Sequence, residues 1–298
     1  MTTVVRFSPD LSSWLVQNLD RGVTPAALMS TMVSQRMEPR AARAIIDAFV
    51  TARREGRAVP LDSVPLDDAE LDYVAEPPRI GNGSSIVAGD RQIRVLARGE
   101  RPTLAILAAV VSGQECAELI AMAKPRLKPS TVLDPHTGQD VVAAYRSSLG
   151  MFFRPQENPL VARLEQRFAQ LMNLPVENGE GLQVLYYPPQ AGSAPHFDFL
   201  QPSTEASRHS IERSGQRVST LVTYLNDVEQ GGETVFPEAA WSVTPQQGHA
   251  LYFEYCNSRG QVDPRSLHAA APVQRGEKWV ASKWMRQRRF VPASGTLV

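Results

Sequence analysis

The spacing of apolar residues divides the chain into two parts. Up to about residue 55, apolar side chains recur at intervals that are typical of amphipathic helices. We predict a helix capped by Asp10, a second that opens at Thr24 and Pro25, and a third that begins near Pro39. The expected inward positions are Leu11, Trp14, Leu15 and Leu19, then Leu28, Met29, Met32 and Val33, and then Ala42, Ile45, Ile46, Phe49 and Val50. Residues 1–55 are therefore expected to form a small N-terminal all-α region.

The pattern changes twice after this region. Residues 56–80 are rich in proline and acidic side chains, which favours a linker. From residue 81 to residue 298, short runs rich in β-branched and aromatic residues alternate with turn residues, and we expect one domain. The predicted strands are 93–98, 150–154, 182–187, 218–227, 249–255 and 278–285.

Two helices are predicted among these strands, at residues 112–124 and 159–173. Ser112 and Glu115 have the spacing of a capping box at the start of the first one. Residues 199–216 are polar and rich in turn formers, and we expect a long loop there. Many strands with few helices indicate an antiparallel β barrel or sandwich flanked by helices.

Charge and composition limit the function classes. Lysine plus arginine balance aspartate plus glutamate at 31 each, so the chain has no overall field that would hold nucleic acid or an anionic membrane. The N-terminal arginines are interpreted as solvated helix faces and not as a DNA-binding surface. No apolar run has the length of a membrane span, and the first residues do not read as a signal peptide. Cys116 and Cys256 lack disulfide-type spacing, which favours the cytoplasm.

Candidate chemistry centres on two histidines and an aspartate. His196 and Asp198 are two residues apart, so on an extended strand both side chains project from one face. With the distant His268 they provide two imidazoles and one carboxylate, the ligand set that holds non-haem Fe(II) and leaves coordination positions open. Lys278 follows and supplies a cation that suits the far carboxylate of 2-oxoglutarate. The four residues predict an iron- and 2-oxoglutarate-dependent oxygenase.

The chain from Ile93 to Arg288 also resembles the catalytic domain of the prolyl 4-hydroxylase family of 2-oxoglutarate oxygenases. The segments that carry the resemblance are residues 145–153, 183–199, 215–237, 243–253 and 266–285. The resemblance implies a mainly β fold with flanking helices (α+β), built on a double-stranded β-helix or jelly-roll core. It also implies Fe(II), 2-oxoglutarate and O2 as cofactors, with ascorbate as reductant, and hydroxylation of a prolyl residue or a related substrate.

The resemblance assigns roles to further residues. It implies that His196, Asp198 and His268 bind the metal, and that Tyr187 and Thr234 assist Lys278 with the outer carboxylate of 2-oxoglutarate. Three more positions match family positions near the substrate. These are Arg217, Trp284 and Arg146.

Two positions depart from the family pattern. Ser193 stands where the family has a tyrosine, and Arg286 stands where it has a histidine. Both positions lie in the family's substrate pocket, so the substrate is expected to be either a peptide or protein prolyl residue or a smaller molecule. The alternatives are therefore a hydroxylase of a free amino acid or natural-product intermediate and, from another class, a non-catalytic 2-oxoglutarate and iron sensor. The complete set of metal-binding residues and Lys278 argues against the sensor.

Overall fold

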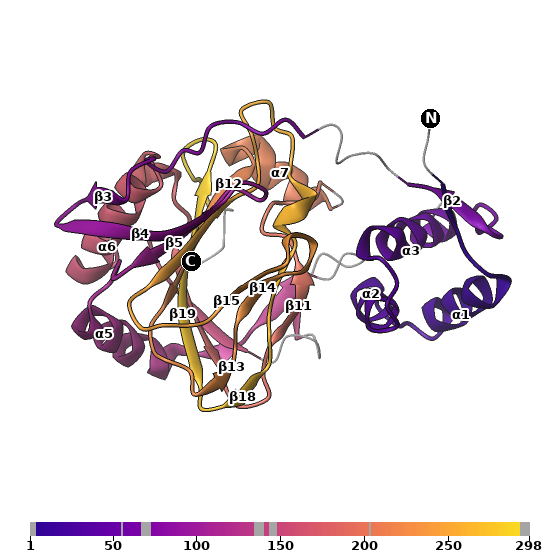
Figure 1. Ribbon diagram of the computed structural model, residues 1–298, viewed down its shortest axis with the longest axis horizontal. Coiled ribbons are helices and arrows are strands. Elements are labelled where there is room, and N and C mark those ends of the chain that lie inside the picture. Colours follow the sequence, from indigo (N-terminus) through magenta and orange to yellow (C-terminus); the bar gives the residue numbers. More distant parts are fainter. Residues whose placement is uncertain are drawn as a thin grey trace. The chain divides into compact units, whose positions relative to one another are not determined.

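The computed structural model describes residues 4–54, 56–66, 73–133, 140–142, 148–202 and 204–292. The chain divides into two compact units, Met1–Tyr73 and Val74–Val298, and each has its own buried core (Figure 1).

The N-terminal unit contains the three predicted helices, α1 (Pro9–Asp20), α2 (Pro25–Ser34) and α3 (Pro39–Arg54). Each begins with proline in its first turn, where the missing N–H has no helical partner to lose. Ser8, and not Asp10 as predicted, caps α1, because its hydroxyl accepts from the N–H of Leu11 at 3.2 Å. Thr24 caps α2 in the same way through Ala27.

The core of this unit lies where the apolar spacing predicted it. Leu15, Leu28, Ile45 and Phe49 are almost completely buried. Two short strands, β1 (Val4–Arg6) and β2 (Ser63–Pro65), pair antiparallel at its edge. Strand β2 falls within the stretch that composition alone assigned to the linker.

The larger unit is built on two antiparallel sheets. The large sheet contains, in order, β3 (Ser85–Ala88), β4 (Arg91–Gly99), β5 (Leu104–Ala108), β16 (Ala250–Glu254), β12 (Arg217–Tyr224), β19 (Lys278–Arg286), β10 (Leu182–Tyr187), β9 (Leu149–Phe153) and β6 (Lys128–Pro129). The small sheet contains β11 (Ser193–His196), β17 (His268–Ala270), β14 (Thr234–Phe236) and β15 (Trp241–Val243). Two further pairs are β13 (Gln230–Gly231) with β18 (Val273–Arg275), and β7 (Thr131–Leu133) with β8 (Asp140–Val142).

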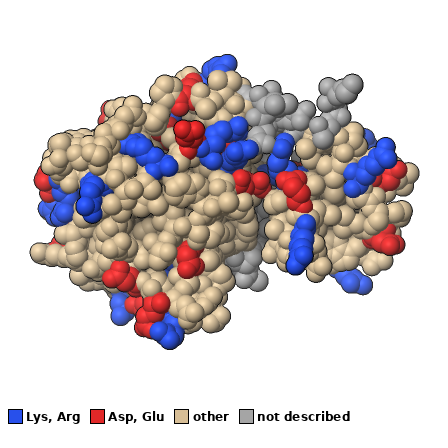
Figure 2. All heavy atoms as spheres, in the orientation of Figure 1, with Lys and Arg blue, Asp and Glu red and all other residues tan. Residues whose placement is uncertain are grey.

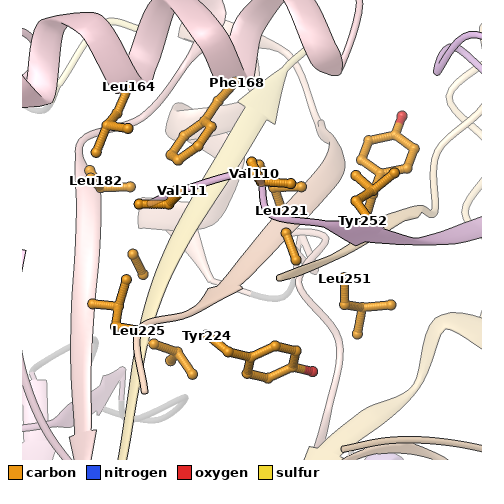
Figure 3. Close-up of a cluster of buried hydrophobic side chains, with 14 of the residues drawn as sticks. Val110, Val111, Leu164, Phe168, Leu182, Leu221, Tyr224, Leu225, Leu251 and Tyr252 are labelled. Carbon is orange, nitrogen blue, oxygen red and sulfur yellow. The ribbon is translucent and has the colours of Figure 1, made fainter. Parts of the chain in front are cut away.

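Helices α5 (Gly113–Ala123) and α6 (Pro159–Leu171) lie beside the large sheet (Figure 1). Ser112 and Glu115 form both hydrogen bonds of the predicted capping box. In Figure 3, Leu164 and Phe168 of α6 point toward Leu182 of β10 and the neighbouring core residues. Short 3-10 helices follow at η1 (Lys124–Arg126), η2 (Val176–Asn178), η3 (Pro237–Ala239) and η4 (Pro264–Ser266).

A third helix of this unit, α7 (Glu205–Ser214), corrects the prediction of a long loop at residues 199–216. Thr204 caps it, and Gly215 ends it with a φ of 74°. Its residues are almost all polar, so no apolar stripe announces the helix in the sequence. The segment that follows Asp198 therefore has a fixed secondary structure of its own.

Side chains from the two sheets meet in a common interior. The rings of Phe236 on β14 and Phe253 on β16 make an edge-to-face contact with centroids 5.2 Å apart. The Tyr224 hydroxyl of β12 donates to the Thr234 hydroxyl of β14 at 2.9 Å. The predicted mainly β fold with a double-stranded β-helix core and flanking helices is thus confirmed.

The surface agrees with the balanced composition. Basic and acidic side chains are interspersed on the face shown in Figure 2. Within the described residues, no helix combines the length and the hydropathy needed to cross a bilayer.

A buried arginine joins α6 to α5 and to the turn between β3 and β4. Arg167 is fully buried, and its guanidinium donates two hydrogen bonds of 2.9 Å to Glu115. It also donates to both carboxylate oxygens of Asp90, at 2.9 and 3.0 Å, and to the carbonyl of Val110. Burial disfavours ionisation of Glu115, but Arg167 and the Ser112 N–H outweigh it and lower its pKa to about 2.

We expect Arg167→Met to lower the free energy of unfolding by roughly 3–5 kcal/mol, because it leaves the buried Glu115 carboxylate without its main partner. Urea denaturation of the purified protein measures the loss. Arg275→Met is the matched control, since Arg275 pairs with Glu229 on the open surface, and it should change stability by less than about 1 kcal/mol. Equal stability of the two variants would contradict this account.

Candidate metal centre

Three predicted ligands converge at the small sheet. His196 ends β11, Asp198 follows two residues later, and His268 opens the neighbouring strand β17, directly opposite His196. One potential ligand atom from each of the three residues lies within 4.8 Å of the others. Nε2 of each histidine is 3.8 Å from a carboxylate oxygen of Asp198. Antiparallel pairing of β11 and β17 thus joins residues far apart in the sequence.

Backbone carbonyls orient both imidazoles. Nδ1 of His196 lies 2.9 Å from the carbonyl oxygen of Ala194, and Nδ1 of His268 lies 2.9 Å from that of Ser266. A carbonyl only accepts, so Nδ1 carries the proton in each ring. Nε2 is then the nitrogen that faces the other ligands, and in the neutral form of each ring it is the one able to bind a metal.

The carboxylate of Asp198 is held from the opposite sheet. Its side chain is buried, and the Thr220 hydroxyl of β12 donates to Oδ2 at 2.6 Å. The hydroxyl oxygen of Thr220 also lies 3.0 Å from the hydroxyl oxygen of Tyr255. Burial disfavours the charge, but His268, His196 and the Thr220 hydrogen bond outweigh it and lower the pKa of Asp198. The carboxyl group is therefore ionised, as a candidate metal ligand has to be.

These residues fit a divalent iron ion. Two imidazole nitrogens and an ionised carboxylate face one point, which is the two-histidine, one-carboxylate arrangement of non-haem Fe(II) sites. The three residues lie at the end of β11, in the turn after it and at the start of β17. A set of three protein ligands of this kind leaves coordination positions open for exogenous ligands.

A second polar group lies between the sheets around Lys278 of β19. Its ammonium is almost fully buried and donates to the carbonyl of Gly232 at 2.6 Å. The nitrogen lies 5.3 Å from the ring centre of Tyr187 and 5.7 Å from that of Tyr224. Burial lowers the pKa of Lys278 to about 8, although Glu233 opposes the shift.

The predicted partners of Lys278 lie around it. Tyr187 is directly opposite Lys278 in the β10–β19 register. Thr234 joins the group through Tyr224, whose hydroxyl donates to Thr234 Oγ1. Since Thr234 accepts this bond, its own hydroxyl hydrogen can be donated to a ligand. Sequence reasoning missed Tyr224, although its place on the predicted strand 218–227 was the available signal.

Arg217 lies on the other side of Asp198. Its guanidinium donates to the Asp198 carbonyl at 3.2 Å and makes a forked ion pair of 2.7 and 2.8 Å with Glu180. It also stacks over the Trp284 ring at 4.2 Å. Arg217 and Trp284 are therefore neighbours, and Glu180 is a partner that sequence reasoning did not find.

The remaining predicted substrate residues have different surroundings. Ser193 Oγ accepts from the N–H of Ala270 on β17 at 3.0 Å. Arg286 is 1% exposed and donates to Glu180 and to Ser210 of α7, so its side chain is enclosed by protein groups. Arg146 lies outside the described residues.

Known proteins resemble this chain along much of its length. The 2OG-Fe(II) oxygenase superfamily matches residues 182–286, a range that includes the three candidate ligands and Lys278. Prolyl 4-hydroxylase 1 of Arabidopsis thaliana is 41% identical over 202 residues, which cover 63% of this chain and 70% of that protein. Probable prolyl 4-hydroxylase 3 of the same plant is 36% identical over 243 residues, covering 75% and 81%.

A solved structure shows a weaker likeness. The viral collagen prolyl hydroxylase from Paramecium bursaria Chlorella virus-1, in complex with 2-oxoglutarate, has 25% identity and a TM-score of 0.49. The match covers 61% of this chain and 95% of that one.

We expect His268→Ala to weaken Fe(II) binding by about 100-fold or more, because even loss of a partner that only orients a ligand costs 10- to 100-fold. Anaerobic calorimetric titration with Fe(II) measures the affinity. His209→Ala is the control, since His209 lies exposed on α7 outside the cluster, and it should bind Fe(II) like the unaltered protein. Metal binding by His268→Ala at the original affinity would exclude this ligand set.

Proposed function

Since the chain belongs to the prolyl 4-hydroxylase family of 2-oxoglutarate- and Fe(II)-dependent oxygenases, we propose that it hydroxylates prolyl residues of a peptide or protein substrate. The single observation that carries the proposal is the convergence of His196, Asp198 and His268 in a chain 41% identical to a prolyl 4-hydroxylase. The proposed cofactors are Fe(II), 2-oxoglutarate and O2, with ascorbate as reductant. Expected partners do not include nucleic acid or membranes.

The proposed division of labour follows from the geometry. Bound iron, together with 2-oxoglutarate and O2, supplies the oxidising chemistry that side chains lack. The two Nε2 atoms of His196 and His268 and the carboxylate of Asp198 hold the metal. Thr220 fixes the rotation of that carboxylate through its 2.6 Å hydrogen bond, and so fixes the direction of the oxygen that binds the metal.

Lys278 is proposed to bind the outer carboxylate of 2-oxoglutarate. Its buried ammonium has three donors, and its 2.6 Å bond to Gly232 uses one of them. The Thr234 hydroxyl, already an acceptor for Tyr224, is proposed to donate to the same carboxylate. Tyr187 lies beside the ammonium and is proposed to complete the group.

The proposed substrate wall combines aromatic rings and polar atoms. Phe152 is 39% exposed, and its ring lies 6.3 Å from that of Trp284. Flat apolar surfaces of this kind suit a pyrrolidine ring. The Trp284 Nε1 and Gln183 Oε1 atoms are buried and have no hydrogen-bond partner within the described residues, which suits a substrate amide that accepts from one and donates to the other. Arg217, which stacks on Trp284, fixes the plane of the indole.

A second candidate keeps the chemistry but changes the substrate to a free amino acid or natural-product intermediate. The observation that favours it is Ser193, a short side chain bonded to the Ala270 backbone at a position where the family has an aromatic ring. A pocket that lacks this ring has one less surface against a peptidyl proline.

The proposed function predicts succinate formation that is stoichiometric with a product 16 Da heavier than a proline-containing peptide. Purified protein is assayed with Fe(II), ascorbate and 2-oxoglutarate, against proline-rich peptides beside free proline and its homologues, with mass spectrometry as the readout. His268→Ala is the control for contaminating activity. Product from free amino acids alone would replace the proposal by the second candidate. Absence of 2-oxoglutarate turnover with every substrate, in protein that binds Fe(II), would support the sensor instead.

The lowered pKa of Lys278 predicts a pH dependence of cofactor binding. In the ligand-free site the ammonium loses its proton as pH rises through about 8, so the cation that attracts 2-oxoglutarate is present below this pH and lost above it. We expect the Kd of 2-oxoglutarate in the presence of Mn(II) to rise about 10-fold from pH 7 to pH 9. Lys278→Arg remains charged, so its Kd should stay flat over this range. An equally flat profile for the unaltered protein would contradict the prediction.

A further inference from the structure

Arg286 is the last residue of strand β19, and its charged side chain is buried. Only 1% of its surface is exposed. Its Nη2 atom donates to the carbonyl and to the hydroxyl of Ser210 in the middle of α7, at 2.7 and 3.0 Å. Its Nη1 atom donates to Glu180 at 3.1 Å. One guanidinium therefore joins a helix of the segment after Asp198 to the carboxylate beside Arg217.

Glu180 carries this connection onward to the metal centre. Its carboxylate accepts from Arg286 and, through both oxygens, from Arg217. Arg217 in turn donates to the carbonyl of Asp198, a proposed metal ligand. A continuous series of hydrogen bonds thus runs from Ser210 on α7 to the backbone of Asp198.

Helix α7 lies in the chain between the two residues at the far end of this series of hydrogen bonds, Asp198 and Arg217. The helix begins seven residues after Asp198 and ends three residues before Arg217, so it lies in the segment that joins the metal ligand to β12. A second arginine holds the C-terminal half of α7, because Arg288 donates to the carbonyls of Ile211 and Glu212. Of the two arginines that hold α7, Arg286 is the one that contacts Glu180.

We propose that Arg286 is a positioning residue that sets α7 and, through Glu180, the orientation of Arg217 beside the substrate. The inference rests on the proposed function, because it concerns how that site accepts its substrate. It replaces the expectation that Arg286 contacts the substrate directly, since both of its terminal nitrogens are bonded to protein groups. The histidine that the family pattern has at this position lacks the reach and the fork to bond Glu180 and Ser210 together.

The contacts of Glu180 also indicate that the protein still folds when Arg286 is replaced. Glu180 keeps its two-point ion pair with Arg217 when Arg286 is absent, so no carboxylate is left unpaired. The two guanidiniums share one carboxylate, and each therefore experiences the like charge of the other. Arg286→Met is consequently expected to release α7 without unfolding the sheets.

The test compares Arg286→Met, Arg286→Lys and Arg288→Met in the full chain. In Arg286→Met we expect backbone amides of α7 to exchange with deuterium about 10-fold faster, and the KM for the peptide substrate to rise about 10-fold, the effect of a coupling of ordinary strength. The Kd of 2-oxoglutarate should change by less than about twofold, because Lys278 lies in a separate group of contacts. Arg286→Lys keeps the charge but not the fork, and should restore the KM only in part.

Arg288→Met is the matched control because it removes contacts to the same helix and leaves Glu180 and Arg217 untouched. Its peptide KM should stay within about twofold of the unaltered protein. An equal rise in KM for Arg288→Met would overturn the proposal, since general anchoring of α7 would then explain the effect. Unchanged exchange of α7 in Arg286→Met would also overturn it, and this readout does not depend on activity. If Arg286→Met does not fold, the deuterium exchange of α7 and the peptide KM are compared between Arg286→Lys and Arg288→Met, with the same outcomes for the proposal.

Discussion

Ionised side chains are buried between the sheets, at their ends and between α6 and the large sheet. Most of them meet a partner from another part of the chain, because an isolated buried charge is far too costly. Asp198 meets Thr220 and the two imidazoles, Glu180 meets Arg217 and Arg286, and Glu165 of α6 meets Lys283 of β19 at 2.6 Å. Each partnership fixes one element against another. The register of the strands and the geometry of the site therefore depend on one another.

Sequence patterns were sufficient to predict the elements that depend mainly on interactions between residues close together in the chain. The three N-terminal helices, the capping box of Ser112 and Glu115, and the strands around residues 182–187 and 278–285 lie where apolar spacing and turn residues predicted them. The candidate metal ligands could also be selected from the sequence, because few residue types bind iron and the pair His196 and Asp198 has a strand-like spacing. The distant His268 and Lys278 completed the set on chemical grounds, and the family resemblance implied the same residues.

The residues that the sequence did not reveal depend on strand order. Thr220 reaches Asp198 only because β12 lies opposite the turn after β11. Glu180 meets Arg217 because the segment before β10 lies beside the end of β19, which in turn pairs with β12. No spacing along the chain encodes such contacts, since they depend on the register of strands far apart in sequence. Helix α7 was missed for a different reason, because a polar helix without an apolar stripe looks like a loop.

Two buried cations at opposite ends of β19 illustrate why burial alone does not identify a binding residue. Arg286 donates to the carboxylate of Glu180, which it shares with Arg217, so a carboxylate already lies beside it before any ligand arrives. Lys278 donates to the carbonyl of Gly232, which carries no net charge, and burial lowers its pKa toward neutrality. An anion that enters beside Lys278 removes this penalty, whereas an anion beside Arg286 has to compete with Glu180. Strand β19 therefore carries one buried cation that can bind an anionic ligand, Lys278, and one that connects parts of the fold, Arg286.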